Sequence, residues 1–452
     1  MHIRHCACIK ENYKDAIKKL NDLQSNSNYL EIVANNSKMN FAKLEDTEKY
    51  LIRSGINLDQ LNNLSIIHVA GTKGKGSVCA FVEAILQIHG FRTGFFSSPH
   101  LITVRERLRI NGSPINETDF AYYFWKVYNK LDNAKEFESD IPMYFKFLTV
   151  LMFNVFLYEN IDVAIIEVGI GGEYDCTNIV KNPVCVGITS LGLDHTSLLG
   201  NTIEEIAYQK SGIFKPNTIA FTVPQKKEAL EILKERAIER QCTLHVVPSF
   251  QYYEWENDQL NNKTLYSQIQ QQNASLAIQL AVYWMQSQIN SNYFLTINNN
   301  ICNKKYYNFQ ENNIEGSIKN INDEQEEMIN KKTNTKYISF KKIATALSTC
   351  IWPGRQQILR DIDNLTTAEV IDEQKMKCQK HCEMWGEQSP HVVKIVANNV
   401  MEVLNDIRME HIHNDETIIW KDKTQVLITG SLHLVGATLA ILDPNFTMTT
   451  KF

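Results

Sequence analysis

The chain has 452 residues, of which 44% are hydrophobic and 21% charged, a balance typical of a globular protein with a large core. Its net charge of −5 excludes the strongly basic surface that recruits nucleic acid or anionic membranes. We therefore expect no nucleic-acid partner, and local donors must hold any phosphorylated ligand. The 10 cysteines follow no disulfide framework, which favours a reducing compartment.

The N-terminal stretch "MHIRHCACIK" has no acidic residue before Glu11, a short match to an organellar transit peptide. We expect a cytoplasmic protein, with the mitochondrion, at the matrix or the inner-membrane face, as the alternative. The longest apolar run, residues 147–158, is too short for a bilayer and contains Asn154. This run predicts a buried helix and no stable membrane insertion.

Apolar runs typical of buried strands alternate with stretches of helical periodicity after the helical residues 10–55. The expected strands are 65–70, 92–98, 162–169, 184–192 and 218–223. The expected helices are 77–89, 119–131, 144–158, 202–214 and 228–240. This alternation predicts an α/β fold with a mostly parallel sheet, whose ligands gather at the carboxyl ends of the strands.

The composition changes between residues 290 and 337, where Asn, Lys and Glu dominate and apolar periodicity is lost. We interpret this segment as an insertion or linker. The expected organisation is therefore an N-terminal extension (1–40), a large α/β domain (41–289), the insertion (290–337) and a smaller C-terminal domain (338–452).

The glycine-rich stretch "HVAGTKGKGSVCAF" (residues 68–81) lies between the first expected strand and the first expected helix of the sheet. It differs from the pattern G-x-x-x-x-G-K-[ST] because a glycine separates Lys75 from the following serine. Glycines at such a turn let backbone N–H groups approach phosphate oxygens, and lysines add positive charge. The expected phosphate cradle consists of Thr72, Lys73, Gly74, Lys75, Gly76 and Ser77.

Oxygen and imidazole ligands follow three other strands of the expected sheet: Ser98, Glu167 and His195. Because the carboxyl ends of parallel strands share one edge of the sheet, these side chains can meet beside the phosphate cradle. Hard oxygen ligands suit Mg²⁺, and imidazole is a common metal ligand. The alternatives are a solvent-capped glutamate and a structural histidine.

Basic residues surround this edge. The stretch "RERLR" carries Arg105, Arg107 and Arg109, which we expect to meet carboxylates of an anionic substrate, with a solvated basic strand as the alternative. Lys210, in "IAYQKSGIFK", is a candidate charge partner or carbamylated ligand near a metal, although a surface lysine on a helix is the simpler interpretation.

Several long motifs in order resemble eukaryotic folylpolyglutamate synthases, whose wider relatives are the dihydrofolate synthases and the Mur ligases. The motifs are "HVAGTKGKGS", "GFFSSPHLITVRERLRINGSPI", "EVGIGGEYDCTN", "SLGLDHTSLLGNTIEEIAYQKSGIFK", "QQQNASLAIQLA", "WPGR" and "VLITGSLHLVG". The resemblance implies a P-loop ATPase domain followed by a smaller Rossmann-like domain. It also implies a ligase that adds L-glutamate to the γ-carboxylate of a reduced folate through an acyl phosphate.

The resemblance assigns roles residue by residue. Residues 72–77 with Asn273 and Arg355 match ATP contacts; Ser98, Glu167 and His195 match Mg²⁺ ligands; Asp175 matches a folate contact; Lys210 and His195 match catalytic positions. Gln271 stands where the family has an arginine, so that contact is not carried over. The expected ligands are ATP, Mg²⁺ with a monovalent cation as an option, a reduced folate and L-glutamate, bound by a monomer.

One departure is larger. After "WPGRQQILR" the family continues into a strand that ends in Asp-Gly-Ala-His-Thr, and Asp-Gly-Ala-His occurs nowhere in this chain. We therefore expect an incomplete second domain in residues 338–452. This leaves three hypotheses: an active ligase, an impaired isoform or incomplete gene model that still binds nucleotide or folate, and a dihydrofolate synthase-type ligase.

Overall fold

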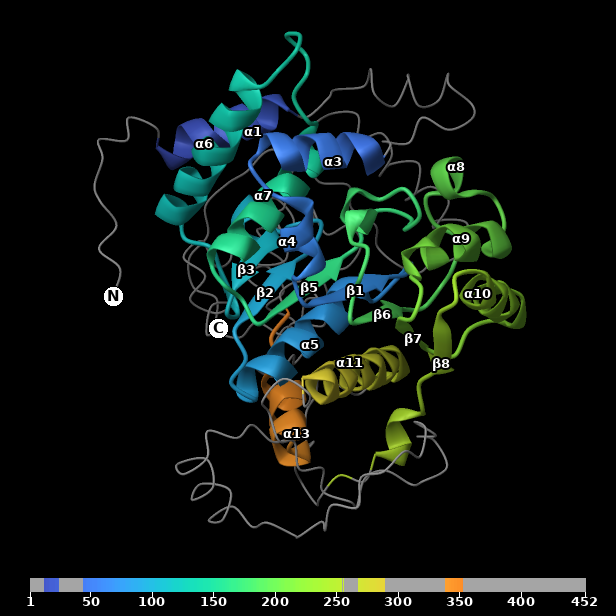
Figure 1. The fold of residues 1–452 in the computed structure, drawn as a ribbon. Helices are drawn as coiled ribbons and strands as arrows, with labels where there is room; N and C mark the ends of the chain where they lie inside the picture. The colour runs from blue at the N-terminus through green and yellow to red at the C-terminus, as the bar shows by residue number, and fades with distance from the viewer. Residues whose placement is uncertain (1–11, 24–43, 254, 256–266, 289–337, 353–452) are drawn as a thin grey trace, which may run out of the picture. The chain divides into compact units, whose positions relative to one another are not determined.

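The computed structural model describes residues 12–23, 44–253, 255, 267–288 and 338–352. Within them an eight-stranded sheet has the order β4-β3-β2-β5-β1-β6-β7-β8 (Figure 1). Its strands are β1 (Ile66–Ala70), β2 (Thr93–Phe96), β3 (Leu108–Ile110), β4 (Ser113–Pro114), β5 (Val163–Glu167), β6 (Cys185–Ile188), β7 (Ile219–Thr222) and β8 (Thr243–Val246). In this spatial order, all pairings between β2 and β8 are parallel. Strand β3 pairs antiparallel with both β2 and β4. The predicted mostly parallel α/β sheet is confirmed.

The five expected strands correspond to β1, β2, β5, β6 and β7. Every residue of β1 and β5 is buried, as expected for central parallel strands covered on both faces. Strand β8 was not predicted, because it is a short edge strand that is partly exposed along its length.

The β3–β4 hairpin was also not predicted, although its turn has a clear sequence signal. Asn111 and Gly112 both have positive φ angles, of 51° and 83°, which is the conformation of a two-residue type I′ turn. Asn-Gly is the dipeptide that best tolerates this turn, so "RINGSP" contained the evidence for a hairpin.

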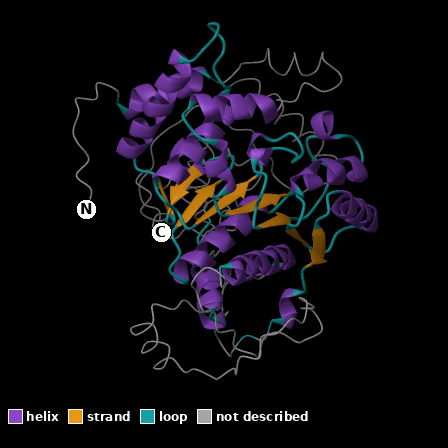
Figure 2. Ribbon diagram, in the orientation of Figure 1, coloured by secondary structure: helices purple, strands orange, loops and turns teal. Residues whose placement is uncertain are grey.

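Helices cover both faces of the sheet (Figures 1 and 2). On one side lie α5 (Lys75–Ile88), α11 (Gln268–Ser287) and α13 (Phe340–Thr349); on the other lie α1 (Tyr13–Asp22), α3 (Leu44–Arg53), α6 (Glu117–Asn133) and α7 (Tyr144–Tyr158). Helices α9 (Ile203–Lys210) and α10 (Lys227–Glu239) pack beside β6 and β7 around a buried cluster that includes Phe214 and Leu233.

Shorter helical segments connect these elements. They are α4 (Leu58–Asn62), α8 (Thr196–Leu199) and the 3₁₀ helices η1 (Val104–Arg107), η2 (Cys176–Ile179), η3 (Ser211–Ile213) and η4 (Phe250–Tyr252). Helix α7 coincides with the predicted buried helix and has 15 residues. Across the residues described here, no helix combines the length and apolar character needed to span a membrane.

The described residues up to Ser98 and from Arg105 to Cys350 belong to one compact unit, and residues 99–104 and 351–352 belong to a second. Helix α13 lies in the first unit, although the sequence suggested a separate domain for residues 338–452. The predictions for the insertion (290–337) and for most of the C-terminal domain lie outside the described residues. The other domain boundaries stay predictions.

Candidate functional site

The glycine loop between β1 and α5 has a backbone that only glycine adopts easily. Gly71 and Gly74 have φ angles of +147° and +94°. A Cβ atom on Gly71 would lie 1.8 Å from Thr189 Oγ1, and one on Gly74 would lie 2.4 Å from Asn273 Oδ1. The loop is therefore packed tightly between the end of β6 and helix α11.

Helix α5 begins at Lys75 directly after this loop, and its N-cap residue Gly74 provides no side-chain cap. The first backbone N–H groups of a helix have no intrahelical acceptor, and the helix dipole makes this end attractive to anions. A phosphate group can accept hydrogen bonds from these N–H groups.

The loop after β6 holds the glycine loop in place. The backbone N–H groups of Thr72 and Lys73 donate to the Ser190 carbonyl at 3.0 and 3.2 Å. The Thr72 hydroxyl donates to the Gly192 carbonyl and accepts from the Gly192 N–H, both at 3.1 Å. Because these amides are already used, the donors left for a phosphate lie further along, at the start of α5.

Two lysines converge on one oxygen beneath the loop. Lys75 Nζ donates to the Gly71 carbonyl at 3.1 Å, and Lys210 Nζ donates to the same oxygen at 2.8 Å. Lys210 is only 2% exposed, so the interpretation as a surface lysine is wrong. Burial, together with the smaller effect of the charge of Lys75, lowers the pKa of Lys210 to about 7. Two cations held this close favour an anion at the same place.

Glu167 ends strand β5 and is 4% exposed. Its Oε2 accepts a hydrogen bond of 3.2 Å from the backbone N–H of Ser98, which follows β2. The structure therefore brings Glu167 and Ser98 together, as the sequence predicted. The Glu167 carboxylate and the serine at the neighbouring strand end together offer hard oxygen donors of the kind that suits Mg²⁺.

His195 lies in the loop after β6, with a φ angle of 49° and an exposed side chain. Its backbone N–H donates to Asp194 Oδ1 at 3.0 Å, and Asp194 also pairs with the exposed Lys73 at 3.3 Å. In the part of the chain that the structure describes, no three His, Cys, Asp or Glu side chains gather as a metal cluster. The role of His195 as a metal ligand stays a prediction.

Asp175, the predicted folate contact, is 8% exposed and holds the loop that follows β5. Its Oδ2 accepts from the Ile170 N–H at 3.0 Å, and its Oδ1 accepts from the Thr177 N–H at 3.0 Å and the Thr177 hydroxyl at 2.6 Å. Burial raises the pKa of Asp175, while the hydrogen bonds from Thr177 oppose this shift. We call residues 169–175 the β5 loop.

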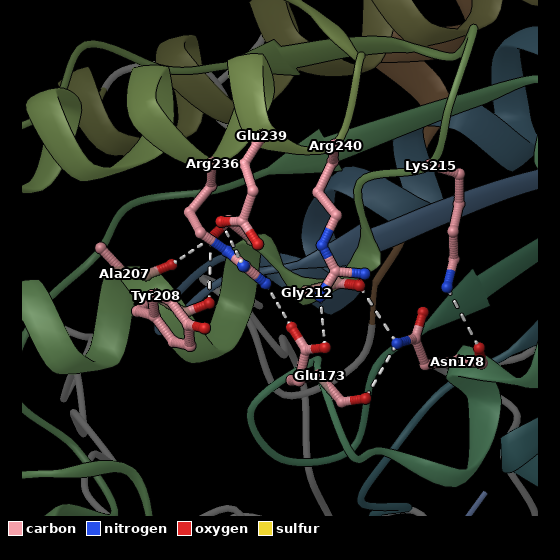
Figure 3. A network of polar contacts seen from close by, with 10 residues as sticks. Glu173, Asn178, Ala207, Tyr208, Gly212, Lys215, Arg236, Glu239 and Arg240 are labelled. Carbon is pink, nitrogen blue, oxygen red and sulfur yellow. Dashed lines mark hydrogen bonds and ion pairs between the residues drawn. The ribbon is translucent and has the colours of Figure 1, made fainter.

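Sequence reasoning missed an ion-pair network that fixes the β5 loop to helices α9 and α10 (Figure 3). Glu173 pairs with Arg236, which is 2% exposed, and with Arg240 at 2.5 Å. The Glu173 N–H donates to the Gln209 carbonyl at 2.8 Å. These contacts join residues far apart in the sequence, so no local pattern predicts them.

The network also fixes the position of Lys210 at the end of α9. A Cβ atom on Gly172 would lie 2.7 Å from the Lys210 carbonyl, and one on Gly212 would lie 2.3 Å from Glu173 Cα. Asn178 Nδ2 donates to the carbonyls of Glu173 and Gly212 at 3.0 and 3.1 Å (Figure 3). The β5 loop and the end of α9 therefore touch backbone to backbone.

The three arginines of "RERLR" have different environments. Arg109 forms a buried ion pair of 3.0 Å with Glu83, and Arg105 pairs with Glu117 at 3.6 Å. Burial lowers the pKa of Arg107, and the nearby Tyr144 and Glu167 oppose the shift. Arg109 is buried and paired within the protein, so the alternative of a solvated basic strand is wrong for this residue. The expectation that these arginines meet carboxylates of a substrate stays a prediction.

Asn273 lies on α11, is 2% exposed and contacts the glycine loop at Gly74, and its role as an ATP contact stays a prediction. Its Nδ2 donates to Gln270 Oε1 at 3.1 Å. Arg355, the other predicted ATP contact, lies outside the described residues.

Comparison with solved structures defines the class of fold. The structure matches an AMPPCP complex of a folylpolyglutamate synthase with a TM-score of 0.63, covering 95% of this chain and 98% of that chain at 20% identity. It matches the apo enzyme from L. casei with a TM-score of 0.64, also at 20% identity. The fold is that of the folylpolyglutamate synthases, as the motifs predicted.

Sequence comparison narrows this class. The chain is 51% identical over 278 residues to the mitochondrial folylpolyglutamate synthase of Cricetulus griseus, and 50% identical over 277 residues to that of Homo sapiens. Each match covers 61% of this chain and 47% of the relative. No protein-family model matches the chain. The resemblance to eukaryotic folylpolyglutamate synthases is confirmed, and the chain spans about half the length of the curated relatives it matches.

Proposed function

We propose that this protein is an ATP-dependent ligase that adds L-glutamate to the γ-carboxylate of reduced folates. The observation that carries this proposal is the loop after β1, where α5 begins without a side-chain cap and Lys75 and Lys210 both donate to the Gly71 carbonyl. The sequence identity of about half with eukaryotic folylpolyglutamate synthases supports the choice of substrate.

In this proposal ATP binds at the glycine loop. Its β- and γ-phosphates accept hydrogen bonds from the N–H groups of residues 74–77 at the start of α5. Lys75 turns from the Gly71 carbonyl to the phosphates, because a phosphate is the stronger acceptor for an ammonium group. Asn273, at the other side of Gly74, and Arg355 complete the nucleotide contacts.

Ser98, Glu167 and His195 are the proposed holders of Mg²⁺. Glu167 and Ser98 fit this role, since the carboxylate and the hydroxyl belong to neighbouring strand ends at the edge that carries the glycine loop. When bound, Mg²⁺ supplies positive charge that neutralises the phosphate oxygens. The exposed His195 can turn toward the same edge.

The proposed reaction has two steps. An oxygen of the folate γ-carboxylate bonds to the γ-phosphorus of ATP, and the bond to ADP breaks, which leaves an acyl phosphate. The amine of glutamate then bonds to the acyl carbon, loses a proton, and phosphate departs. Lys75 and, in its ammonium form, Lys210 stabilise the negative charge that develops on the transferred phosphate.

Lys210 has a second proposed role as a carbamate. An amine with a pKa of about 7 is substantially unprotonated at neutral pH and can bond to CO₂, releasing one proton. The product is an anionic side chain at a place where Lys75 supplies a compensating charge.

The folate is proposed to bind beside the β5 loop. Ile170 and Tyr174 are each 41% exposed there and offer apolar surface for a flat ring. Asp175 keeps the loop in shape from inside. This arrangement lets the folate tail approach the glycine loop along the carboxyl edge of the sheet.

The test is incubation of the full chain with tetrahydrofolate, MgATP and labelled glutamate. We expect label in the folate product, and we expect Lys75→Ala to reduce incorporation by at least about 100-fold, because such charge contacts contribute roughly 3 kcal/mol to the transition state. A Lys181→Ala variant, changed at an exposed lysine away from the loop, is the matched control.

The absence of Asp-Gly-Ala-His from the sequence favours a second candidate, a protein that binds nucleotide and folate without turnover. Binding of AMPPCP and tetrahydrofolate without incorporation would select this candidate over the ligase. Incorporation with dihydropteroate, and none with tetrahydrofolate, would select a dihydrofolate synthase-type ligase.

We propose a cytoplasmic location together with a mitochondrial pool, at the matrix or the inner-membrane face, because the relatives from Cricetulus griseus, Bos taurus and Homo sapiens are named as mitochondrial. Fractionation with an antibody against the chain tests this. Absence from both fractions would contradict it.

A further inference from the structure

A buried histidine, His68, lies inside the sheet on β1, the strand that leads to the glycine loop. His68 is in the middle of β1, is fully buried, and stands in register with Ile166 of β5 and Val186 of β6. The other residues of β1 are Ile66, Ile67, Val69 and Ala70. A polar ring among these apolar side chains requires a partner.

The partner is a relay that leads to the β5 loop. His68 Nε2 lies 2.9 Å from Thr177 Oγ1, and Thr177 Oγ1 donates to Asp175 Oδ1 at 2.6 Å. A hydroxyl has one proton, and Thr177 gives it to the carboxylate. His68 Nε2 must therefore carry a proton and donate it to the hydroxyl.

The second ring nitrogen has no such partner. In this tautomer His68 Nδ1 is a hydrogen-bond acceptor, and it is buried without a partner among the described residues. Burial lowers the pKa of His68 to about 3, and the charge of Lys215 acts in the same direction. The ring therefore stays neutral at ordinary pH and donates a hydrogen bond from Nε2 alone.

This arrangement costs stability. A buried polar atom without a partner is unfavourable, and an apolar side chain of similar size would fill the same place in β1 without that loss. The hydrogen bond from His68 to Thr177 therefore explains this histidine better than a contribution to sheet stability does.

We propose that His68 is a positioning residue of the β5 loop: through Thr177 it orients the Asp175 carboxylate, which holds the backbone N–H groups of Ile170 and Thr177 and so gives the loop its folate-binding shape. The inference deepens the proposed function and rests on its assignment of folate to this loop. His68 itself touches no substrate.

The test compares His68→Leu with His68→Gln in the full chain. Leucine removes the donor, whereas the Gln Nε2 amide can reach the Thr177 hydroxyl and restore the relay. Thr177→Val and Thr177→Ser form a second pair: valine removes the hydroxyl and serine keeps it. If a His68 variant does not fold, this pair tests whether the relay holds the β5 loop.

Three measurements are made on each variant: hydrogen exchange of the Ile170 and Thr177 amides without ligand, tetrahydrofolate affinity in the presence of MgAMPPCP, and Tm. For His68→Leu we expect faster exchange at both amides and about tenfold weaker folate binding, the change that follows from loss of one well-positioned hydrogen bond. We expect unchanged AMPPCP affinity and a Tm that is equal to or above that of the original chain. His68→Gln should behave like the original chain.

Unchanged exchange in His68→Leu would overturn the inference, as would a lowered Tm with equal losses for folate and AMPPCP, which is the result of a purely structural role. If the original chain itself binds no tetrahydrofolate, the proposed function fails. The exchange measurement then still decides whether His68 holds the β5 loop, so the two failures are distinguishable.

Discussion

Gly74, the last residue of the glycine loop before α5, has a backbone conformation that favours glycine. Its φ angle of +94° disfavours any other residue, and a Cβ atom would meet Asn273 Oδ1 at 2.4 Å. The same loop contacts the N-terminus of α5, so a shift at this position moves the donors proposed for phosphate.

We expect Gly74→Ala to weaken AMPPCP binding about tenfold or more, because a left-handed conformation costs an alanine roughly 1–2 kcal/mol before the contact with Asn273 is considered. The matched control is Gly192→Ala at the same edge, where a Cβ atom would have its nearest neighbour at an ordinary 4.0 Å. Equal AMPPCP affinities of both variants, measured by calorimetric titration, would contradict the packing described for the loop.

Lys210 gives the protein a pH dependence with a definite sign. Its pKa is lowered from 10.5 to about 7. Between these values the unfolded chain binds a proton that the folded chain does not, so the free energy of unfolding rises with pH across this window. Lys215, whose pKa is lowered to about 8 by burial, acts in the same direction, so a variant is needed to separate the two.

We expect Lys210→Met to raise the free energy of unfolding at pH 7 by roughly 2–4 kcal/mol, since the variant no longer keeps an amine in a buried site. The difference should shrink toward pH 10. Urea denaturation of both proteins at pH 7, 8, 9 and 10 measures it. Parallel curves for the two proteins would show that Lys210 is not the group that titrates.

At the scale of elements, the β5 loop is held by the side chain of Glu173. Its carboxylate pairs with Arg236 of α10, which is almost fully buried, and with Arg240, which directly follows that helix. Removing one partner of a buried ion pair leaves the other charge without compensation. The resulting loss of folding free energy is larger than the stabilisation that the pair itself provides.

We expect Glu173→Gln to lower the free energy of unfolding by about 2–3 kcal/mol and to reduce turnover further, through the shift of Lys210 at the adjoining end of α9. Glu239→Gln is the control: it also pairs with Arg236, at 2.7 Å, but is 57% exposed and should change stability by about 0.5 kcal/mol or less. A control as damaging as Glu173→Gln in urea denaturation would argue against the described network.

The sequence predicted the elements that have strong local patterns. The central strands β1 and β5 were recognised because each is a continuous apolar run, and the loop and helix after β1 because glycines precede a helical pattern. Strand β8 escaped because a partly exposed edge strand needs little apolar sequence.

The sequence predicted those residues of the site that lie at the ends of strands. Lys75, Glu167 and Ser98 follow strands that the sheet places side by side, and the parallel topology brings them to one edge. The contact of Glu173 with Arg236, 63 positions away, and the relay from His68 to Thr177, 109 positions away, depend on tertiary packing. Neither leaves a local signal in the sequence.

At the scale of the whole molecule, four parallel strand ends in the first compact unit supply the proposed machinery for activating a carboxylate. This chain spans about half the length of these relatives, and we propose the complete ligation reaction for it. The proposed ligation differs from simple nucleotide binding because phosphate is transferred to the folate carboxylate.

The most direct test uses tetrahydrofolate whose γ-carboxylate carries ¹⁸O, incubated with the full chain, MgATP and glutamate, with the released phosphate analysed by mass spectrometry. An acyl phosphate transfers one carboxylate oxygen to phosphate when the glutamate amine displaces it, so the proposal predicts one ¹⁸O atom in the phosphate for each amide bond formed. Phosphate free of ¹⁸O, or ATP that stays intact while both ligands bind, would contradict the proposed function.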